Sequence, residues 1–214
     1  MEKLGWMLVL GFLIAGCTQT DHSDKNHVSG MKNDSTGIVG TEKPQAGTTI
    51  TFKGNPVHTI GKLPAVGTQA PDFTLVATDL SDKTLKDYSG KNIILNIFIS
   101  VNTGVCSASV HEFNKDAASL KNTVVLCISK DLPFGQEQFC GAAGIHDVVM
   151  LSDFRNDFGK LYGVQMVDGK FRGLLSRAVV VINPQGKIVY EQQVPELSHE
   201  PDYAAALAAV RSGT

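Results

Sequence analysis

The chain has 214 residues, of which 43% are hydrophobic and 19% are charged, so it is long enough and apolar enough to bury the core of one globular domain. Its formal net charge is −2, which gives no electrostatic support for binding to nucleic acid. The sequence shows no internal repeat.

The beginning of the chain has the pattern of an export signal. Lys3 is followed by an apolar run over residues 4–14 that is too short to span a membrane comfortably. The run ends in small residues at "IAGC", which resembles a bacterial lipobox. We therefore predict a lipoprotein signal peptide over residues 1–16 and a lipid on Cys17, which would anchor an exported protein to a bacterial cell membrane, on its periplasmic or outer face. The alternatives are a plain secretory signal with an incidental cysteine and a misassigned start codon.

The segment that follows is poor in residues that can form a core. Residues 17–48 are rich in Ser, Thr, Asn, Asp and Gly, and no aromatic residue lies between Phe12 and Phe52. Such a segment buries too little apolar surface to offset the entropy lost on ordering. We predict a flexible tether over residues 17–48 and a folded domain over residues 49–214.

The domain contains several patterns that are typical of strands. Residues 49–60 ("TITFKGNPVHTI") hold two short runs of β-forming residues around Gly54-Asn55-Pro56, which predicts an N-terminal β-hairpin. Another strand is predicted within residues 72–80. Three near-continuous apolar runs then predict central strands that are covered on both faces, and a further strand forms a hairpin with the third run: residues 92–100, 123–129 and 178–182, followed by 187–193.

Helical patterns lie between and after these strands. Apolar residues recur at helical spacing over residues 110–120, and further helices are predicted after Pro133, over residues 155–162 and over residues 201–211. Strands that alternate with helices indicate an α/β domain with a central mixed β-sheet flanked by helices. We predict a thioredoxin-like fold, with a flavodoxin-like sheet as the main alternative, because periodicity alone does not separate the two.

Cys106 lies where the strand over residues 92–100 gives way to a helix. Thr103 is a candidate N-cap, which places Cys106 at the third helical position, where a capping box holds a carboxylate. Unpaired backbone N–H groups and the positive end of the helix dipole favour a thiolate there, so we expect a lowered pKa for this cysteine. The Thr103 hydroxyl could also donate a hydrogen bond to the sulfur. The alternative is a small apolar cysteine that packs under the helix.

Two more cysteines follow in the domain. Cys140 is predicted at the end of a short helix, with Gly141 as its stop signal. Cys127 lies in the middle of the apolar run 123–129, and we interpret it as a buried structural residue. Paired cysteines are common in exported proteins, but three cysteines after Cys17 leave the pairing open.

The chain resembles the thiol peroxidase subfamily of the peroxiredoxins, the atypical two-cysteine type, in five segments: "NIFISVNTGVCSASV", "NTVVLCISKDLPF", "FCGAAG", "SRAVVVI" and "EPDYAAAL". The resemblance extends from about residue 49 to the C-terminal helix. It implies a thioredoxin-like fold, a homodimer, and reduction of hydrogen peroxide and organic hydroperoxides. The implied reductant is thioredoxin or a thioredoxin-like protein.

The same resemblance assigns roles to four residues. Cys106 would be the peroxidatic cysteine, which becomes a sulfenic acid, and Cys140 would be the resolving cysteine, which condenses with it to an intramolecular disulfide. Thr103 would orient the thiolate and the peroxide, and Arg177 would stabilise the charge that develops on the leaving oxygen. Because the family's cysteines lie far apart when reduced, local unfolding near Cys140 is implied in each cycle.

The sequence departs from the family motif at two positions. Ile99 stands where the family has proline, and Asn102 stands where it usually has aspartate. Isoleucine is bulkier than proline and has an N–H group that proline lacks. These two departures from the motif leave the rate and the peroxide preference open.

Two other functions stay open. One is a membrane-anchored, thioredoxin-like disulfide exchange protein, which would ordinarily need a cysteine in place of Thr103. The other is a binding lipoprotein that keeps the fold without the chemistry. We predict no cofactor and no metal site, because Cys106 and His111 are five positions apart and no ligand cluster accompanies them.

Overall fold

The structure is a computed structural model and describes residues 47–212. The predicted signal peptide, Cys17 and all but the last two residues of the predicted tether lie outside the described residues. The strands are β1 (Thr49–Phe52), β2 (Asn55–His58), β3 (Thr74–Ala77), β4 (Asp82–Thr84), β5 (Asn92–Ile97), β6 (Thr123–Ser129), β7 (Val149–Ser152), β8 (Ala178–Ile182) and β9 (Ile188–Gln193). The helices are α1 (Gly104–Ala117), α2 (Pro133–Ala143), α3 (Phe158–Leu161), α4 (Tyr203–Ser212) and the short 3-10 helix η1 (Leu85–Tyr88).

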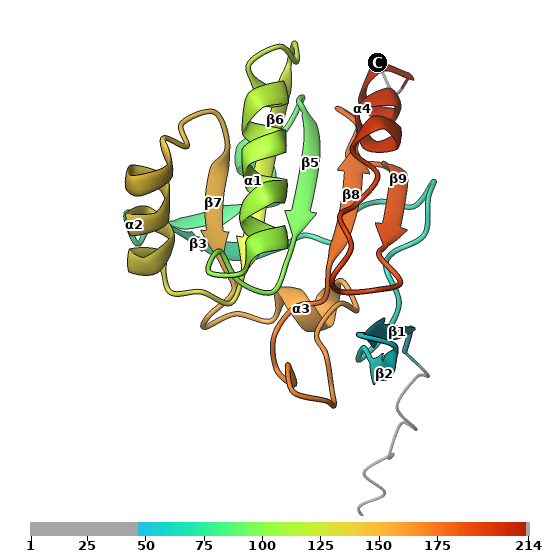
Figure 1. The fold of residues 1–214 in the computed structure, drawn as a ribbon. Coiled ribbons are helices and arrows are strands. Elements are labelled where there is room, and N and C mark those ends of the chain that lie inside the picture. Colours follow the sequence, from blue (N-terminus) through green and yellow to red (C-terminus); the bar gives the residue numbers. More distant parts are fainter. Residues whose placement is uncertain (1–46, 213–214) are drawn as a thin grey trace, which may run out of the picture. The chain divides into compact units, whose positions relative to one another are not determined.

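A mixed sheet runs through the middle of the domain (Figure 1). Its seven strands lie in the order β4-β3-β7-β6-β5-β8-β9. The three strands β5, β6 and β7 are parallel, whereas β8 pairs antiparallel with β5, and β9 pairs antiparallel with β8. A flavodoxin-like sheet would be parallel throughout. The antiparallel β8–β9 hairpin beside β5 therefore confirms the thioredoxin-like alternative.

Two apolar cores lie on opposite faces of this sheet. Alternate residues of β5 point to opposite faces, so Ile94 joins the core under α1, α2 and α4, while Ile93 and Leu95 join the core beside α3 and η1. Every residue of β5 is buried, which explains why all of its residues except Asn92 and Asn96 are apolar. The predicted runs over residues 123–129 and 178–182 are β6 and β8, with the expected bounds.

The bounds of α2 correct one sequence prediction. Pro133 begins the helix, as expected for a residue without an N–H group to pair. Gly141 does not stop it; the helix continues to Ala143, and Gly144 follows in the left-handed conformation with φ +65°. A glycine ends a helix only where the backbone turns left-handed, and that turn occurs three residues after Gly141.

The predicted N-terminal hairpin is present as β1 and β2, with its turn slightly earlier than expected. Lys53 and Gly54 form the turn, and both have positive φ angles, 52° and 77°. Two successive positive φ values are typical of the type I′ turn that joins two-residue hairpins. Asn55 and Pro56, which the sequence placed in the turn, belong to β2 and pair with Phe52 and Thr51.

Two short strands were not predicted. The edge strand β4 has the sequence DKT, whose polar residues leave no apolar pattern to detect. The strand β7 has only four residues and pairs between β3 and β6. None of the helices within residues 47–212 is both long and apolar enough to cross a lipid bilayer.

We expect Leu95→Ala to lower the free energy of unfolding by about 3 kcal/mol, because it leaves a cavity in the central strand, where Leu95 is fully buried. The measurement is urea denaturation followed by circular dichroism. Leu161→Ala is the matched control, since that side chain is 47% exposed and should change stability by less than about 0.5 kcal/mol. Equal effects of the two substitutions would contradict the assigned core.

Candidate active site

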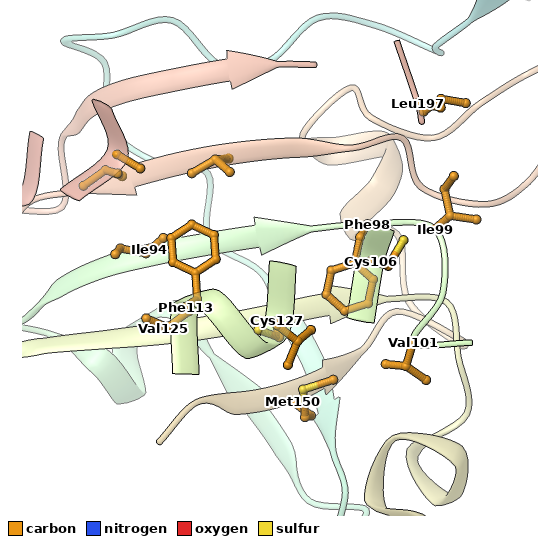
Figure 2. Packing of buried hydrophobic residues seen from close by; sticks show 14 of the residues in the cluster. Ile94, Phe98, Ile99, Val101, Cys106, Phe113, Val125, Cys127, Met150 and Leu197 are labelled. Carbon is orange, nitrogen blue, oxygen red and sulfur yellow. The ribbon is translucent and has the colours of Figure 1, made fainter. Parts of the chain in front are cut away.

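Cys106 lies in the first turn of α1, directly after the loop that leaves β5. The N-cap residue is Thr103, with an extended backbone (φ −109°, ψ 140°), so Cys106 occupies the third helical position, as predicted. Its side chain is completely buried. Figure 2 shows it near Phe98 and Ile99, the first two residues after β5, and all three belong to the core under α1. The thiol is therefore shielded from bulk solvent.

The Thr103 side chain has a different partner from the one expected. Its hydroxyl donates a hydrogen bond to the Ser100 carbonyl oxygen at 3.2 Å, and not to the Cys106 sulfur. The backbone N–H of Thr103 donates to the same carbonyl, also at 3.2 Å, so a tight turn before α1 directs both donors to one oxygen. The hydroxyl oxygen still has lone pairs that can accept a hydrogen bond.

The guanidinium group of Arg177 contacts the Cys106 sulfur. Its Nη2 donates to Sγ at 3.4 Å and to the Leu197 carbonyl oxygen at 3.1 Å, and its Nε donates to the same carbonyl at 3.3 Å. The sheet explains how residues far apart in the chain meet. Ala178 of β8 pairs with Ile97 of β5, so Arg177 lies beside the point where the chain leaves β5 toward Cys106.

The charge on Arg177 is buried without a carboxylate partner. The side chain is 1% exposed, and none of the ion pairs within residues 47–212 includes it. Its Nη1 is buried and has no hydrogen-bond partner in the described part of the chain. A buried cation strongly favours nearby negative charge. The Cys106 sulfur therefore lies against a buried positive charge.

A hollow of about 440 Å³ opens beside this pair. It is bounded by the loop before α1, the β1–β2 turn, the loop that carries Phe171, and the segment after β9. Phe52 and Phe171, which both line the hollow, make an edge-to-face contact with ring centres 4.9 Å apart. The lining residues are Phe52, Lys53, Ile99, Thr103, Gly104, Val105, Phe171, Arg177, Leu197 and Ser198. Most of them are apolar, and Arg177 supplies the buried charge.

Asp131 holds the loop that precedes Cys106, and it was missed in the sequence. Its carboxylate accepts hydrogen bonds from the Ser100 hydroxyl at 2.7 Å, the Val101 N–H at 2.8 Å and the Ser129 hydroxyl at 2.8 Å. Asp131 follows β6, and the Ser100 loop follows the parallel neighbour β5. A polar residue just after each of two parallel strands was the available signal, because the C-terminal ends of such strands lie at one edge of the sheet.

The other two cysteines of the domain differ in their surroundings. Cys140 lies in the last turn of α2, is half-buried, and packs against the core that contains Cys106. Burial raises the pKa of the Cys140 thiol, so it is neutral at pH 7 in this conformation. Cys127 is fully buried in β6, as predicted, and burial raises the pKa of its thiol to about 12. All three thiols are free.

The described residues contain no group of three or more His, Cys, Asp or Glu side chains arranged to hold a metal ion. His111 lies near Phe139 of α2, with ring centres 6.1 Å apart, and does not join Cys106 in a ligand set. The chemistry available at this site is therefore that of a thiol beside a guanidinium group.

The sequence matches the Redoxin family over residues 65–207. It is 51% identical to the thiol peroxidase of Corynebacterium glutamicum over 159 residues, which are 74% of this chain and 96% of that protein. It is 50% identical to the thiol peroxidase of Mycobacterium bovis over 161 residues, which are 75% of this chain and 97% of that protein. The chain belongs to the thiol peroxidases of the Redoxin family. A peroxiredoxin-type thiol peroxidase reduces peroxides with a cysteine thiol.

Solved structures agree with the fold of this thiol peroxidase. A peroxiredoxin-like protein from Aquifex aeolicus superimposes with a TM-score of 0.75 and 34% identity, over 79% of this chain and 99% of the other. A thiol peroxidase from Chromobacterium violaceum superimposes with a TM-score of 0.73 over the same shares of the two chains. Its identity is 20%, so this second likeness concerns the fold alone.

The predicted site residues of the thiol peroxidase fall into two groups. Thr103 and Arg177 line the hollow, and Cys106 is next to it through its contact with Arg177, whereas Cys140 lies on a separate helix. Of the two departures from the family motif, Ile99 is buried and lines the hollow, and Asn102 is exposed at the turn before α1. Ile99 is therefore the departure that is placed to affect access to the sulfur.

Arg177→Lys should lower kcat/KM for hydrogen peroxide by about 10²-fold, since a single ammonium group cannot donate in the fork geometry that joins Leu197 to the sulfur. The assay is peroxide consumption with dithiothreitol as reductant. Arg155→Lys is the matched control, because Arg155 pairs with Asp82 on the surface and should tolerate the change. An unchanged rate for Arg177→Lys would show that the guanidinium group is not needed.

Proposed function

We propose that Cys106 is the peroxidatic cysteine of this thiol peroxidase and that it reduces hydrogen peroxide and organic hydroperoxides. The observation that supports this most directly is the contact between the Cys106 sulfur and the buried Arg177 guanidinium, at the first turn of a helix. Both the guanidinium and the helix end favour a thiolate, which is the nucleophilic form of cysteine. The ionisation of Cys106 itself stays a prediction.

In the proposed first step, the Cys106 thiolate attacks the terminal peroxide oxygen. An S–O bond forms and the O–O bond breaks, so the sulfur is oxidised to a sulfenic acid and the peroxide is reduced. The leaving oxygen takes the electron pair of the broken bond and is protonated to water or an alcohol. Arg177 is suited to stabilise the charge on this oxygen through its unpartnered Nη1, and the Thr103 oxygen is suited to accept a hydrogen bond from the peroxide.

In the second step, we assign Cys140 as the resolving cysteine. Its thiol attacks the sulfenic sulfur, an S–S bond forms, and the oxygen leaves as water. A disulfide requires Cα atoms about 4.4–6.8 Å apart, so the two helices must rearrange. The construction of α2 supports unwinding from its C-terminal end. Its fully buried residues, Pro133 and Gln136, lie in the first turns, and Gln136 donates hydrogen bonds to the Ser129 hydroxyl and the Leu151 carbonyl, both at 3.0 Å.

The last turn of α2, which carries Cys140, contains only half-buried and exposed residues. The Cys140 carbonyl accepts hydrogen bonds from the N–H groups of Gly144 and Ile145, which are lost when this turn opens. Opening also removes the burial that raises the pKa of the Cys140 thiol, so a larger fraction becomes the nucleophilic thiolate as the thiol becomes accessible. A dithiol protein of the thioredoxin type is the proposed reductant, and it would reopen the exposed disulfide by thiol exchange. The homodimer implied by the family resemblance stays a prediction.

Substitution of the two cysteines separates the two steps. We expect Cys106→Ser to be inactive with any reductant, because it removes the attacking sulfur. Cys140→Ser should lose thioredoxin-linked turnover while it still forms a sulfenic acid that a dimedone probe traps. The measurements are peroxide turnover and mass spectrometry of the domain without residues 1–46. Cys127→Ser is the control, since the proposed cycle does not use this thiol; equal turnover by wild type and Cys106→Ser would eliminate the proposal.

We also propose that the protein is exported and anchored by a lipid on Cys17, after removal of residues 1–16. The support is the order of Lys3, the apolar run and the small residues before Cys17. Mass spectrometry of the protein purified from membranes should show an acylated N-terminal Cys17, and Cys17→Ala should release the protein from the membrane fraction. An unmodified N-terminus at Met1 would refute this assignment.

A further inference from the structure

One carboxylate outside the reacting groups connects the β1–β2 turn to the segment after β9. The side chain of Glu196 accepts hydrogen bonds from the Thr51 hydroxyl (2.7 Å), the Lys53 N–H (3.0 Å), the Gly54 N–H (3.2 Å), the Ser198 N–H (3.2 Å) and the Ser198 hydroxyl (2.6 Å). The hydroxyls of Ser198 and Thr51 and the Lys53 N–H hold the pKa of Glu196 well below its usual range. The carboxylate is therefore ionised at every pH near neutral.

The β1–β2 turn is shaped to receive this carboxylate. Lys53 and Gly54 both have positive φ angles, and their consecutive N–H groups point to the two oxygens of Glu196. Consecutive backbone N–H groups in a turn form a concave binding site for an anion. The backbone of Lys53 is in the left-handed region, which is uncommon for a residue other than glycine and needs stabilising contacts. Glu196 supplies that support from the other end of the chain.

The same segment carries the carbonyl that holds Arg177. Thr51 donates its N–H to the Pro195 carbonyl at 2.7 Å, and Leu197 donates its N–H to the Thr51 carbonyl at 2.9 Å. These bonds and Glu196 fix Leu197, whose carbonyl oxygen accepts from both Nε and Nη2 of Arg177. A continuous series of hydrogen bonds thus runs from the β1–β2 turn through residues 195–198 to Arg177 and Cys106.

The two segments that Glu196 joins also contribute to the lining of the hollow. Phe52 ends β1, Lys53 lies in the β1–β2 turn, and Leu197 and Ser198 come from the segment after β9. Ile99 and other residues of the loop before α1 supply a further part of the lining. The part of a substrate that lies beyond the peroxide group would contact the lining that Glu196 holds together.

We propose that Glu196 is a positioning residue and a determinant of peroxide selectivity in this enzyme. Its carboxylate keeps the β1–β2 turn in place as part of the lining of the hollow, and it fixes the Leu197 carbonyl that orients Arg177. The inference rests on the proposed roles of Cys106 and Arg177. Glu196 touches no reacting atom; a bulky hydroperoxide depends on the lining of the hollow and on Arg177, whereas hydrogen peroxide depends mainly on Arg177.

The test compares Glu196→Gln with Glu191→Gln, a control on β9 that removes the same charge from a neighbouring part of the chain. An amide cannot accept all five hydrogen bonds, and its NH₂ group faces the N–H donors of the turn. We expect kcat/KM to fall about threefold for hydrogen peroxide and about tenfold for cumene hydroperoxide. Glu191→Gln should leave both values unchanged.

The selectivity ratio separates positioning from general destabilisation. Loss of folded protein lowers both rates by the same factor, so an unchanged ratio of the two kcat/KM values in Glu196→Gln would overturn the proposal. Thr51→Val is a second variant that keeps the charge; it removes the hydrogen bond of the Thr51 hydroxyl to Glu196 and the longer one, 3.2 Å, to the Pro195 carbonyl. It should also lower kcat/KM for cumene hydroperoxide more than for hydrogen peroxide, but by a smaller factor than Glu196→Gln. If Glu196→Gln does not fold, as judged by thermal unfolding, an unchanged ratio in Thr51→Val overturns the role instead.

A parallel assay of Cys106→Ser distinguishes this inference from the proposed function. Activity in Cys106→Ser would remove the proposed mechanism, and with it the basis for the role of Glu196. An inactive Cys106→Ser together with a wild-type ratio in Glu196→Gln would leave the mechanism in place and exclude only the positioning role.

Discussion

Arg177 places a guanidinium group in the apolar interior beside Cys106, and much of the surrounding structure serves to keep it there. The antiparallel pairing of β8 with β5 sets the position of Arg177 along the sheet. The Leu197 carbonyl oxygen accepts hydrogen bonds from two nitrogens of its guanidinium group, Nε and Nη2. Burial of an ion costs several kcal/mol unless nearby groups compensate, so this position is maintained only because the fold fixes it from several sides. The β1–β2 turn, far away in sequence, is one of those sides through Glu196.

The two cysteines assigned to the catalytic cycle have opposite structural settings. Cys106 lies in a part of the molecule that is fixed by the sheet, by Asp131 and by Arg177. Cys140 lies in the half-buried last turn of a helix whose buried residues, Pro133 and Gln136, are at its beginning. A rigid setting suits the step that requires alignment with a small substrate, and a weakly held setting suits the step that requires movement. One domain thus combines both requirements by separating them onto α1 and α2.

The sequence was sufficient for the features that depend on local patterns. Continuous apolar runs identified β5, β6 and β8, and the strand-to-helix change identified Cys106 at the third position of α1. The stop of α2 was misplaced because Gly141 and Gly144 look alike in sequence, and only the backbone shows which one is left-handed. The Thr103 hydroxyl was assigned the wrong partner because the Ser100 carbonyl competes for it. Glu196 and Leu197 act through a contact 145 positions away or through a backbone atom, which single-sequence patterns do not register. Asp131 was overlooked although its place just after β6, beside the loop that follows the parallel strand β5, was a signal in the sequence.

The buried guanidinium also links the oxidation state of the protein to its conformational energy. In the proposed cycle, the cation and a Cys106 thiolate would offset each other's cost of leaving water. A sulfenic acid or a disulfide at Cys106 would carry no such charge, so oxidation would remove the anion beside Arg177 and weaken the packing around this cation. The uncompensated charge of Arg177 would then favour the rearrangement that brings Cys140 to Cys106, so each oxidation would itself destabilise the reduced conformation.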